Sequence, residues 1–145
     1  MSTDTQVRPW VKVTSLVLAL AGLAVSAYLT VTHFSAEALL CSEGAVLDCG
    51  TVTTSEQSTL LGVPVAILGL VFFVFVTALC LPFAWRDPRL RWLRLGSVAV
   101  GVLFVVYLVT AEFALIGKIC PWCTVVHVVT LALAGVLVTA ELRRG

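Results

Sequence analysis

Charged residues are scarce in this sequence. Only 12% of its 145 residues are Asp, Glu, Lys or Arg, whereas 60% are hydrophobic and the mean hydropathy is +1.09. This composition excludes a soluble domain of this length. No low-complexity segment or internal repeat is present, and no soluble α/β pattern follows Leu142. We therefore expect a single domain over residues 1–145, without a fused thioredoxin-like module.

Four apolar segments are each long enough to cross a bilayer core, which takes about 20 helical residues. They predict an all-α, integral membrane four-helix bundle with spans at 13–32, 63–83, 96–116 and 120–140. The first span could instead be a secretory signal peptide, because Arg8 and Lys12 precede it and Val25-Ser26-Ala27 resembles a cleavage site. The apolar run continues beyond that point through Val31, which favours an uncleaved helix.

The longest polar segment lies between the first two predicted spans and holds Cys41 and Cys49. Within it, Thr53 and Glu56 match a capping box. The box predicts a short helix from about Thr54 to Leu61. We therefore expect a cysteine-containing loop followed by a half-helix before the second span begins.

Basic residues lie almost entirely on one side of the predicted bundle. Four spans place both termini on the same side, together with a basic turn over residues 86–94 that carries interfacial Trp85 and Trp92. Only Lys118 lies opposite. The other eight basic residues share the side of the termini: Arg8, Lys12, Arg86, Arg89, Arg91, Arg94, Arg143 and Arg144. By the positive-inside rule this side is cytoplasmic, so we expect a multi-pass plasma-membrane protein whose two cysteine pairs meet at the extracytoplasmic face.

The segment Cys120-Pro121-Trp122-Cys123 opens the fourth predicted span. Cysteines at positions i and i+3 of a helix face the same way and are close enough to bridge. Pro121 suits the first turn, where its missing N–H is not needed, and the positive end of the helix dipole stabilises a thiolate. A disulfide that closes so short a loop restrains little of the unfolded chain, so we favour thiol–disulfide exchange over a structural staple.

The second pair, Cys41 and Cys49, taken alone could be an ordinary loop disulfide, and all four cysteines could gather into a zinc site. Zinc is disfavoured because only one pair has the usual finger spacing and an oxidising compartment competes for the thiolates, so we expect no metal. Together, the pairs suggest a relay that passes two electrons from Cys41/Cys49 to Cys120/Cys123 through a mixed disulfide. Electrons that arrive at the membrane interface need an acceptor, and a lipid-soluble quinone held between the outer helix ends is the obvious one.

These features resemble the vitamin K epoxide reductase family, in its bacterial disulfide-forming branch. The resemblance covers almost the whole chain. It rests on Cys41 and Cys49 with seven residues between them, Ser55, Gly62-Val63-Pro64, Gly69 and Cys120-Pro121-Trp122-Cys123. It implies a four-helix membrane bundle around a quinone, which we expect to be menaquinone or ubiquinone.

The resemblance also implies an order of events at the cysteines. A reduced thioredoxin-like partner attacks the Cys41–Cys49 disulfide at Cys41, Cys49 exchanges with Cys120, and Cys123 delivers electrons to the quinone. Because we expect no fused thioredoxin domain, the partner is expected to be a separate extracytoplasmic DsbA-like protein.

The same resemblance allows three further positions to be compared with the residues that family members carry there. Ser55 matches a family serine near the quinone ring. His127 occupies the position at which animal members carry a tyrosine, four residues after the last cysteine. Val65 is a departure, because many members have an asparagine there that hydrogen-bonds the quinone.

Other polar residues in the apolar segments have competing interpretations. His127 is either functional or satisfied by an interhelix hydrogen bond. Glu112, near the outer end of the third span, could act on a proton during quinol formation, pair with Lys118, or extend to the surface. Lys118 could favour the Cys120 thiolate or anchor the interface. Cys80, near the opposite end, is expected to be a small packing residue.

The sequence thus predicts a membrane thiol:quinone oxidoreductase that re-oxidises an extracytoplasmic partner. We expect it to interact with quinone and the lipid bilayer, and with no nucleic acid. One alternative is the unrelated disulfide-bond oxidase family of four-helix quinone reductases, but there the Cys-x-x-Cys pair precedes the wider pair. Another is a four-span scaffold protein with structural disulfides in its outer loops.

The predicted topology can be tested by thiol accessibility. In single-cysteine variants of reduced, sealed cells, a membrane-impermeant maleimide should label Cys41 and Cys123 from outside and leave Cys80 unlabelled. A result that places Cys41 and Cys123 on opposite sides of the membrane would exclude a direct electron relay between the two pairs.

Overall fold

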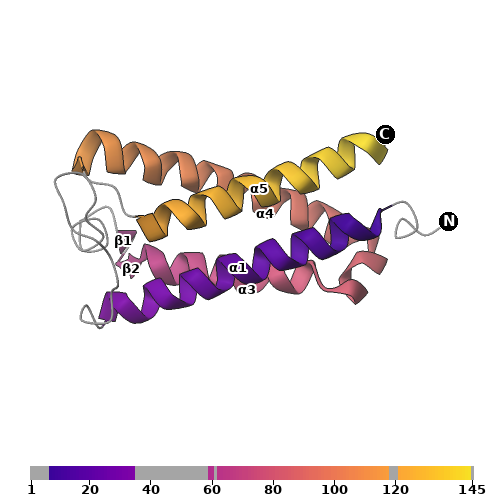
Figure 1. Cartoon of the computed structure of the whole chain (residues 1–145), viewed down its shortest axis with the longest axis horizontal. Coiled ribbons are helices and arrows are strands. Elements are labelled where there is room, and N and C mark those ends of the chain that lie inside the picture. Colours follow the sequence, from indigo (N-terminus) through magenta and orange to yellow (C-terminus); the bar gives the residue numbers. More distant parts are fainter. Residues whose placement is uncertain (1–6, 35–58, 61, 118–120, 145) are drawn as a thin grey trace.

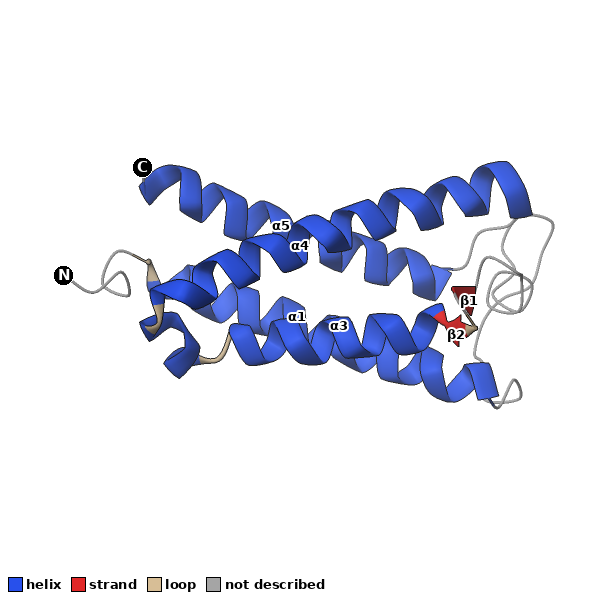
Figure 2. Cartoon of the chain, turned by 180° about the vertical axis from the view of Figure 1, so that it is seen from behind, coloured by secondary structure: helices blue, strands red, loops and turns tan. Residues whose placement is uncertain are grey.

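The computed structural model of the protein describes residues 7–34, 59–60, 62–117 and 121–144. In this part of the chain four main helices lie side by side in a bundle (Figures 1 and 2). They are α1 (Pro9–Phe34), α3 (Val65–Leu79), α4 (Pro88–Thr110) and α5 (Pro121–Arg144). Three segments, Pro9–Phe34, Pro88–Leu115 and Pro121–Arg143, are long and apolar enough to cross a membrane. The predicted all-α membrane bundle is confirmed to that extent.

The second helix is shorter than the span predicted at 63–83. Helix α3 is apolar, comprises 15 residues and measures about 22 Å, less than a bilayer core. It ends at Cys80 because Leu81, which precedes Pro82, is extended, with φ −64° and ψ 148°. A proline disfavours the helical conformation of the residue before it. The chain continues as a short 3-10 helix, η4 (Pro82–Arg86).

The segment before α3 is a small hairpin. Strands β1 (Thr59–Leu60) and β2 (Val63–Pro64) pair antiparallel, and Gly62 adopts a positive φ of 81°. Glycine reaches this conformation without steric cost, which suits a tight hairpin turn. The half-helix predicted up to Leu61 is therefore wrong at Thr59–Leu60, and its earlier part, 54–58, lies outside the described residues.

The predicted basic turn over 86–94 is mostly helical. Asp87 is the N-cap of α4, and its side chain accepts a hydrogen bond from the backbone N–H of Arg89 at 2.9 Å. Pro88 occupies the first turn, where its missing donor is tolerated. The helix therefore starts well before Gly96, where the third span was expected to begin. It continues as a π-helical turn, η5 (Ala111–Ile116), up to the predicted end of that span.

A buried arginine holds the α3–α4 connection. The Arg94 Nη1 donates hydrogen bonds to the carbonyl oxygens of Leu79 (2.8 Å) and Ala84 (3.4 Å), and its guanidinium lies 3.9 Å from the Trp85 ring centroid. The Trp85 Nε1 in turn donates to the carbonyl of Cys80 at 3.0 Å. A cation at the C-terminal end of α3 satisfies carbonyls that the helix leaves unpaired. Trp85 is thus buried in the bundle, which corrects its predicted interfacial position.

Helix α1 presents small side chains to its neighbours. Its buried face includes Ser15, Ala19, Gly22 and Ser26, spaced three or four residues apart, and it contacts both α3 and α5. The Phe73 ring fills the space at Gly22, where an added Cβ would stand 2.1 Å from the phenylalanine Cε1. Such small-residue faces let membrane helices approach closely. Helix α1 is therefore an integral part of the packed bundle, as an uncleaved span requires.

The ends of the bundle differ in content. The beginning of α1, the end of α5 and the α3–α4 connection lie at one end, and the β-hairpin lies at the other (Figure 1). The tightly packed core occupies the half of the bundle that contains the beginning of α1 and the end of α5. Arg91 and Glu141 form an ion pair between α4 and α5 in the same half. The fully buried members of the core are Val11, Ala19, Val76, Cys80, Val98 and Leu133. The burial of Cys80 there agrees with its predicted packing role.

The glycine contact can be tested with a matched pair of substitutions. Gly22→Ala should lower the free energy of unfolding by about 1–3 kcal/mol, because Phe73 must move to admit the methyl group. Gly96→Ala, in α4 with no neighbouring atom within 4 Å, should be neutral or slightly stabilising. Thermal unfolding in detergent, followed by circular dichroism, measures both, and equal effects would contradict the packing described.

Candidate functional site

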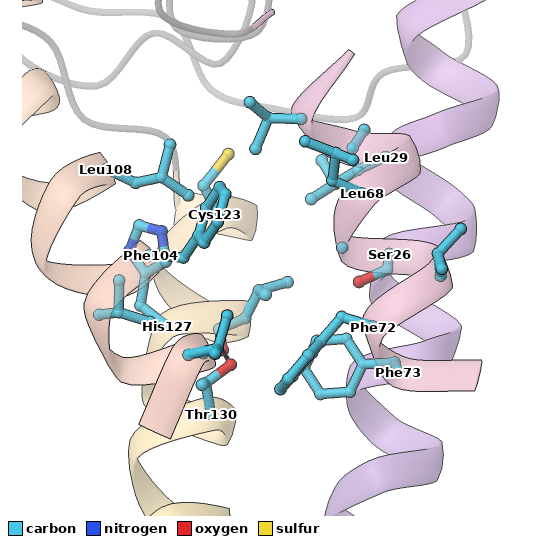
Figure 3. Close-up of a pocket in the computed structure, with 18 of the residues that line it drawn as sticks. Ser26, Leu29, Leu68, Phe72, Phe73, Phe104, Leu108, Cys123, His127 and Thr130 are labelled. Atoms are coloured by element: carbon cyan, nitrogen blue, oxygen red, sulfur yellow. Dashed lines mark hydrogen bonds between the residues drawn. The ribbon is translucent and has the colours of Figure 1, made fainter. Parts of the chain in front are cut away.

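A cavity of about 390 Å³ lies in the half of the bundle next to the β-hairpin. Its walls come from the C-terminal half of α1, from α3 and α4, and from the first turns of α5, and they are almost entirely apolar. Figure 3 shows Cys123 and His127 on one wall and Ser26 on another. The volume is within the range of small-molecule pockets.

Cys123 lies on the first turn of α5, and its side chain lines this cavity. The helix begins at Pro121, in agreement with the predicted role of proline in the first turn. The Trp122 ring packs on Tyr28 of α1, with ring centroids 5.0 Å apart at an angle of 56°. This aromatic contact joins the first turn of α5 to α1 and so helps to position the neighbouring cysteine.

His127 follows Cys123 by one helical turn and is only 6% exposed. It lines the same cavity. Within the described ranges its imidazole makes no hydrogen bond, so the alternative of a satisfied interhelix contact finds no support there. An imidazole that lines a cavity and makes no such bond can take a hydrogen-bond partner from a ligand there.

Glu112 is 4% exposed and also lines the cavity. It belongs to the π-helical turn η5, in which the Gly117 N–H donates to the Glu112 carbonyl at 2.8 Å, and Gly117 has a positive φ of 73°. Single π-helical turns often occur at functional sites. The burial shows that the glutamate does not extend to the surface of the bundle, so that alternative is wrong. The predicted pairing partner, Lys118, lies outside the described residues.

The structure adds polar residues that the sequence interpretation missed. Ser26 of α1 and Thr130 of α5 both line the cavity and are buried. The Thr130 hydroxyl donates to the carbonyl of Val126 at 2.8 Å. The spacing of small residues along α1 could have indicated that Ser26 faces the bundle, although Val25-Ser26-Ala27 was considered there only as a possible cleavage site.

Four of the predicted site residues, Cys41, Cys49, Ser55 and Cys120, lie outside the described part of the chain. The disulfide pairing, the relay and the zinc alternative therefore stay predictions. The residues that the structure brings together are Cys123, His127 and Glu112.

The cavity suits a flat apolar ring that carries polar atoms at its edge. Its apolar walls would bury the ring, while the buried side chains of His127 and Glu112 offer hydrogen-bond partners. The sulfur-bearing side chain of Cys123 lies beside the same space. This combination fits a quinone and would allow a thiol to exchange electrons with it.

A comparison with known protein families agrees with this chemistry. Residues 13–138 match the model described as the Vitamin K epoxide reductase family. The match extends from the first apolar turns of α1 almost to the end of α5, and so includes every helix that lines the cavity.

Proposed function

Because the chain belongs to the vitamin K epoxide reductase family, we propose that it is a membrane thiol:quinone oxidoreductase that re-oxidises a separate extracytoplasmic thioredoxin-like partner. Membership implies thiol-disulfide and quinone oxidoreductase chemistry in general. The observation that carries the specific proposal is the position of Cys123 beside an apolar cavity with two buried ionisable side chains.

The proposed route runs through both cysteine pairs. The partner's two thiols reduce the Cys41–Cys49 disulfide and become a disulfide themselves. Cys49 then attacks the Cys120–Cys123 disulfide at Cys120 and releases Cys123 as a thiol. Cys41 attacks Cys49 of this mixed disulfide, so that the Cys41–Cys49 bond forms again and Cys120 is released as a thiol. A bound quinone supplies an acceptor for two electrons and two protons. When Cys120 and Cys123 return to a disulfide, their electrons leave through Cys123, which faces the cavity.

The buried ionisable residues would handle the protons of this reaction. His127 and Glu112 line the cavity from α5 and from the turn after α4. We propose that each holds a proton at a nitrogen or carboxyl oxygen next to the ring, and that Ser55 contacts the ring as well. Intramembrane ionisable groups are costly, which favours a functional role for both.

The proposed location is the plasma membrane, with cytoplasmic termini and the cavity in the extracytoplasmic half. It is supported by the basic residues that accompany the ends of α1 and α5 and the α3–α4 connection, opposite the hairpin. Menaquinone or ubiquinone, dissolved in the same bilayer, would reach the cavity from the lipid. A scaffold with structural disulfides would have no use for a cavity beside Cys123.

Removal of either cysteine of the Cys-Pro-Trp-Cys pair tests the route. Cys123→Ala and Cys120→Ala should each reduce quinone reduction by a dithiol donor to background, because the disulfide that closes the cycle cannot form. Cys80→Ala is the control, since Cys80 is buried in the core at the other end, and it should retain near wild-type turnover. Unchanged turnover in Cys123→Ala or Cys120→Ala would refute the relay.

The proton-handling role has its own matched pair. Glu112→Gln keeps the shape of the side chain but removes the acid, and should lower kcat by about 100-fold. Glu141→Gln makes the same change at an ion pair with Arg91, outside the cavity, and should leave kcat close to wild type. Steady-state rates of quinol formation compare the two, and a full rate in Glu112→Gln would show that the carboxyl group transfers no proton.

A further inference from the structure

Ser26 differs from the other serine and threonine side chains of the helices around the cavity. It lies in α1, is only 2% exposed, and lines the cavity opposite the wall formed by α5. In Figure 3 its oxygen points toward the cavity, above Phe72 and Phe73. Its hydroxyl is therefore shielded from the outside of the bundle but accessible from within.

Most helical hydroxyl groups nearby are already satisfied. The Thr30 hydroxyl donates to the Ser26 carbonyl at 2.8 Å, and the Thr130 hydroxyl donates to its own helix in the same way. In the described residues the Ser26 hydroxyl makes no such bond. Helical serines commonly bond back to the preceding turn, so its absence here leaves a donor directed into the cavity.

The neighbouring helix leaves this hydroxyl uncovered. An added Cβ at Gly69 of α3 would stand 3.5 Å from the Ser26 Oγ, in van der Waals contact. Because Gly69 has no side chain, the Ser26 hydroxyl stays uncovered on the side where the methyl group of an alanine would contact it. Val65, which also lines the cavity from α3, has no hydrogen-bonding side-chain group.

Among the described cavity residues of α1 and α3, the polar side chains are Ser26 and His33. His33 is partly exposed near the end of α1 and packs its ring edge-on against Phe34. Ser26 lies two helical turns deeper, on the wall that faces His127 and Cys123 (Figure 3). A ring beside Cys123 would therefore meet a hydroxyl on one side and an imidazole on the other.

We propose that Ser26 and His127 bind the two ring oxygens of the quinone from opposite walls of the cavity, which makes Ser26 a substrate-binding residue. This inference rests on the proposed function and extends it. A hydroxyl can donate a hydrogen bond to a quinone oxygen and accept one from the hydroxyl of the quinol. Ser26 can thus bind the ring before and after reduction, while Cys123 supplies the electrons.

Ser15 provides a matched control on the same helix. It lies eleven residues before Ser26, on the same buried face, and its Oγ is buried without a hydrogen-bond partner. It does not line the cavity. Its hydroxyl is enclosed by packing, so no ligand reaches it, and Ser15→Ala removes an equivalent atom without changing the proposed site.

The test compares Ser26→Ala with Ser15→Ala in steady-state kinetics of the full-length protein in detergent. A dithiol donor is kept saturating, and a short-chain ubiquinone and a short-chain menaquinone analogue are varied in turn. Ser26→Ala should raise the quinone KM about three- to tenfold, the loss of one hydrogen bond, and change kcat less than twofold. Ser15→Ala should change neither constant.

Each other outcome has a distinct meaning. A wild-type KM in Ser26→Ala, or an equal rise in Ser15→Ala, would overturn the assignment of Ser26 and leave the proposed function intact. A wild-type protein that reduces neither quinone, with the dithiol donor present, would instead overturn the proposed function. Unfolding temperatures of both variants, measured alongside, show whether the compared proteins are equally folded.

Discussion

Close contact between α1 and its neighbours is the constraint on which the bundle depends. Lipid tails are as apolar as the side chains they replace, so helices in a membrane gain little from hydrophobic burial and must associate by packing. Gly22 of α1 leaves room for the Phe73 ring of α3, and Gly101 of α4 leaves room for the Phe72 ring of α3. The two rings, 5.0 Å apart and edge-to-face, lie at the boundary between the filled half of the bundle and the hollow half.

This boundary separates the packed half of the bundle, which stabilises the fold, from the half that contains the cavity. On one side lie the packed core and the buried arginine that joins α3 to α4. On the other side the cavity collects a cysteine and three side chains that are expensive to bury: a histidine, a glutamate and a serine. Their cost is tolerated because the filled half holds the helices in place, and a bound ring would satisfy the polar groups. The aromatic contact of Trp122 with Tyr28 extends that support to the helix start that carries the thiol.

Several elements could be predicted from the sequence because their signals are local. Apolar runs indicated helices, and Cys-Pro-Trp-Cys indicated a helix start, which agrees with α5 beginning at Pro121. The errors arose where backbone geometry overrides hydropathy. Pro82 ends the second helix early, the Asp87 cap starts α4 before its apolar stretch, and Gly62 closes a hairpin in place of a helix. Each of these is a steric or capping effect of one residue, which an average over an apolar window conceals.

The sequence by itself determined which segments are apolar enough to leave water, and it predicts a reactive thiol pair at the start of the last of them. Only the tertiary structure decided which face of each helix borders the cavity. An apolar helix in a membrane meets lipid on one side and protein on the other, and both favour the same side chains, so periodicity does not reveal the inward face. Ser26 and Glu112 acquire their positions from packing: Gly69 leaves the serine uncovered, and the π-helical turn that holds the glutamate borders the same cavity.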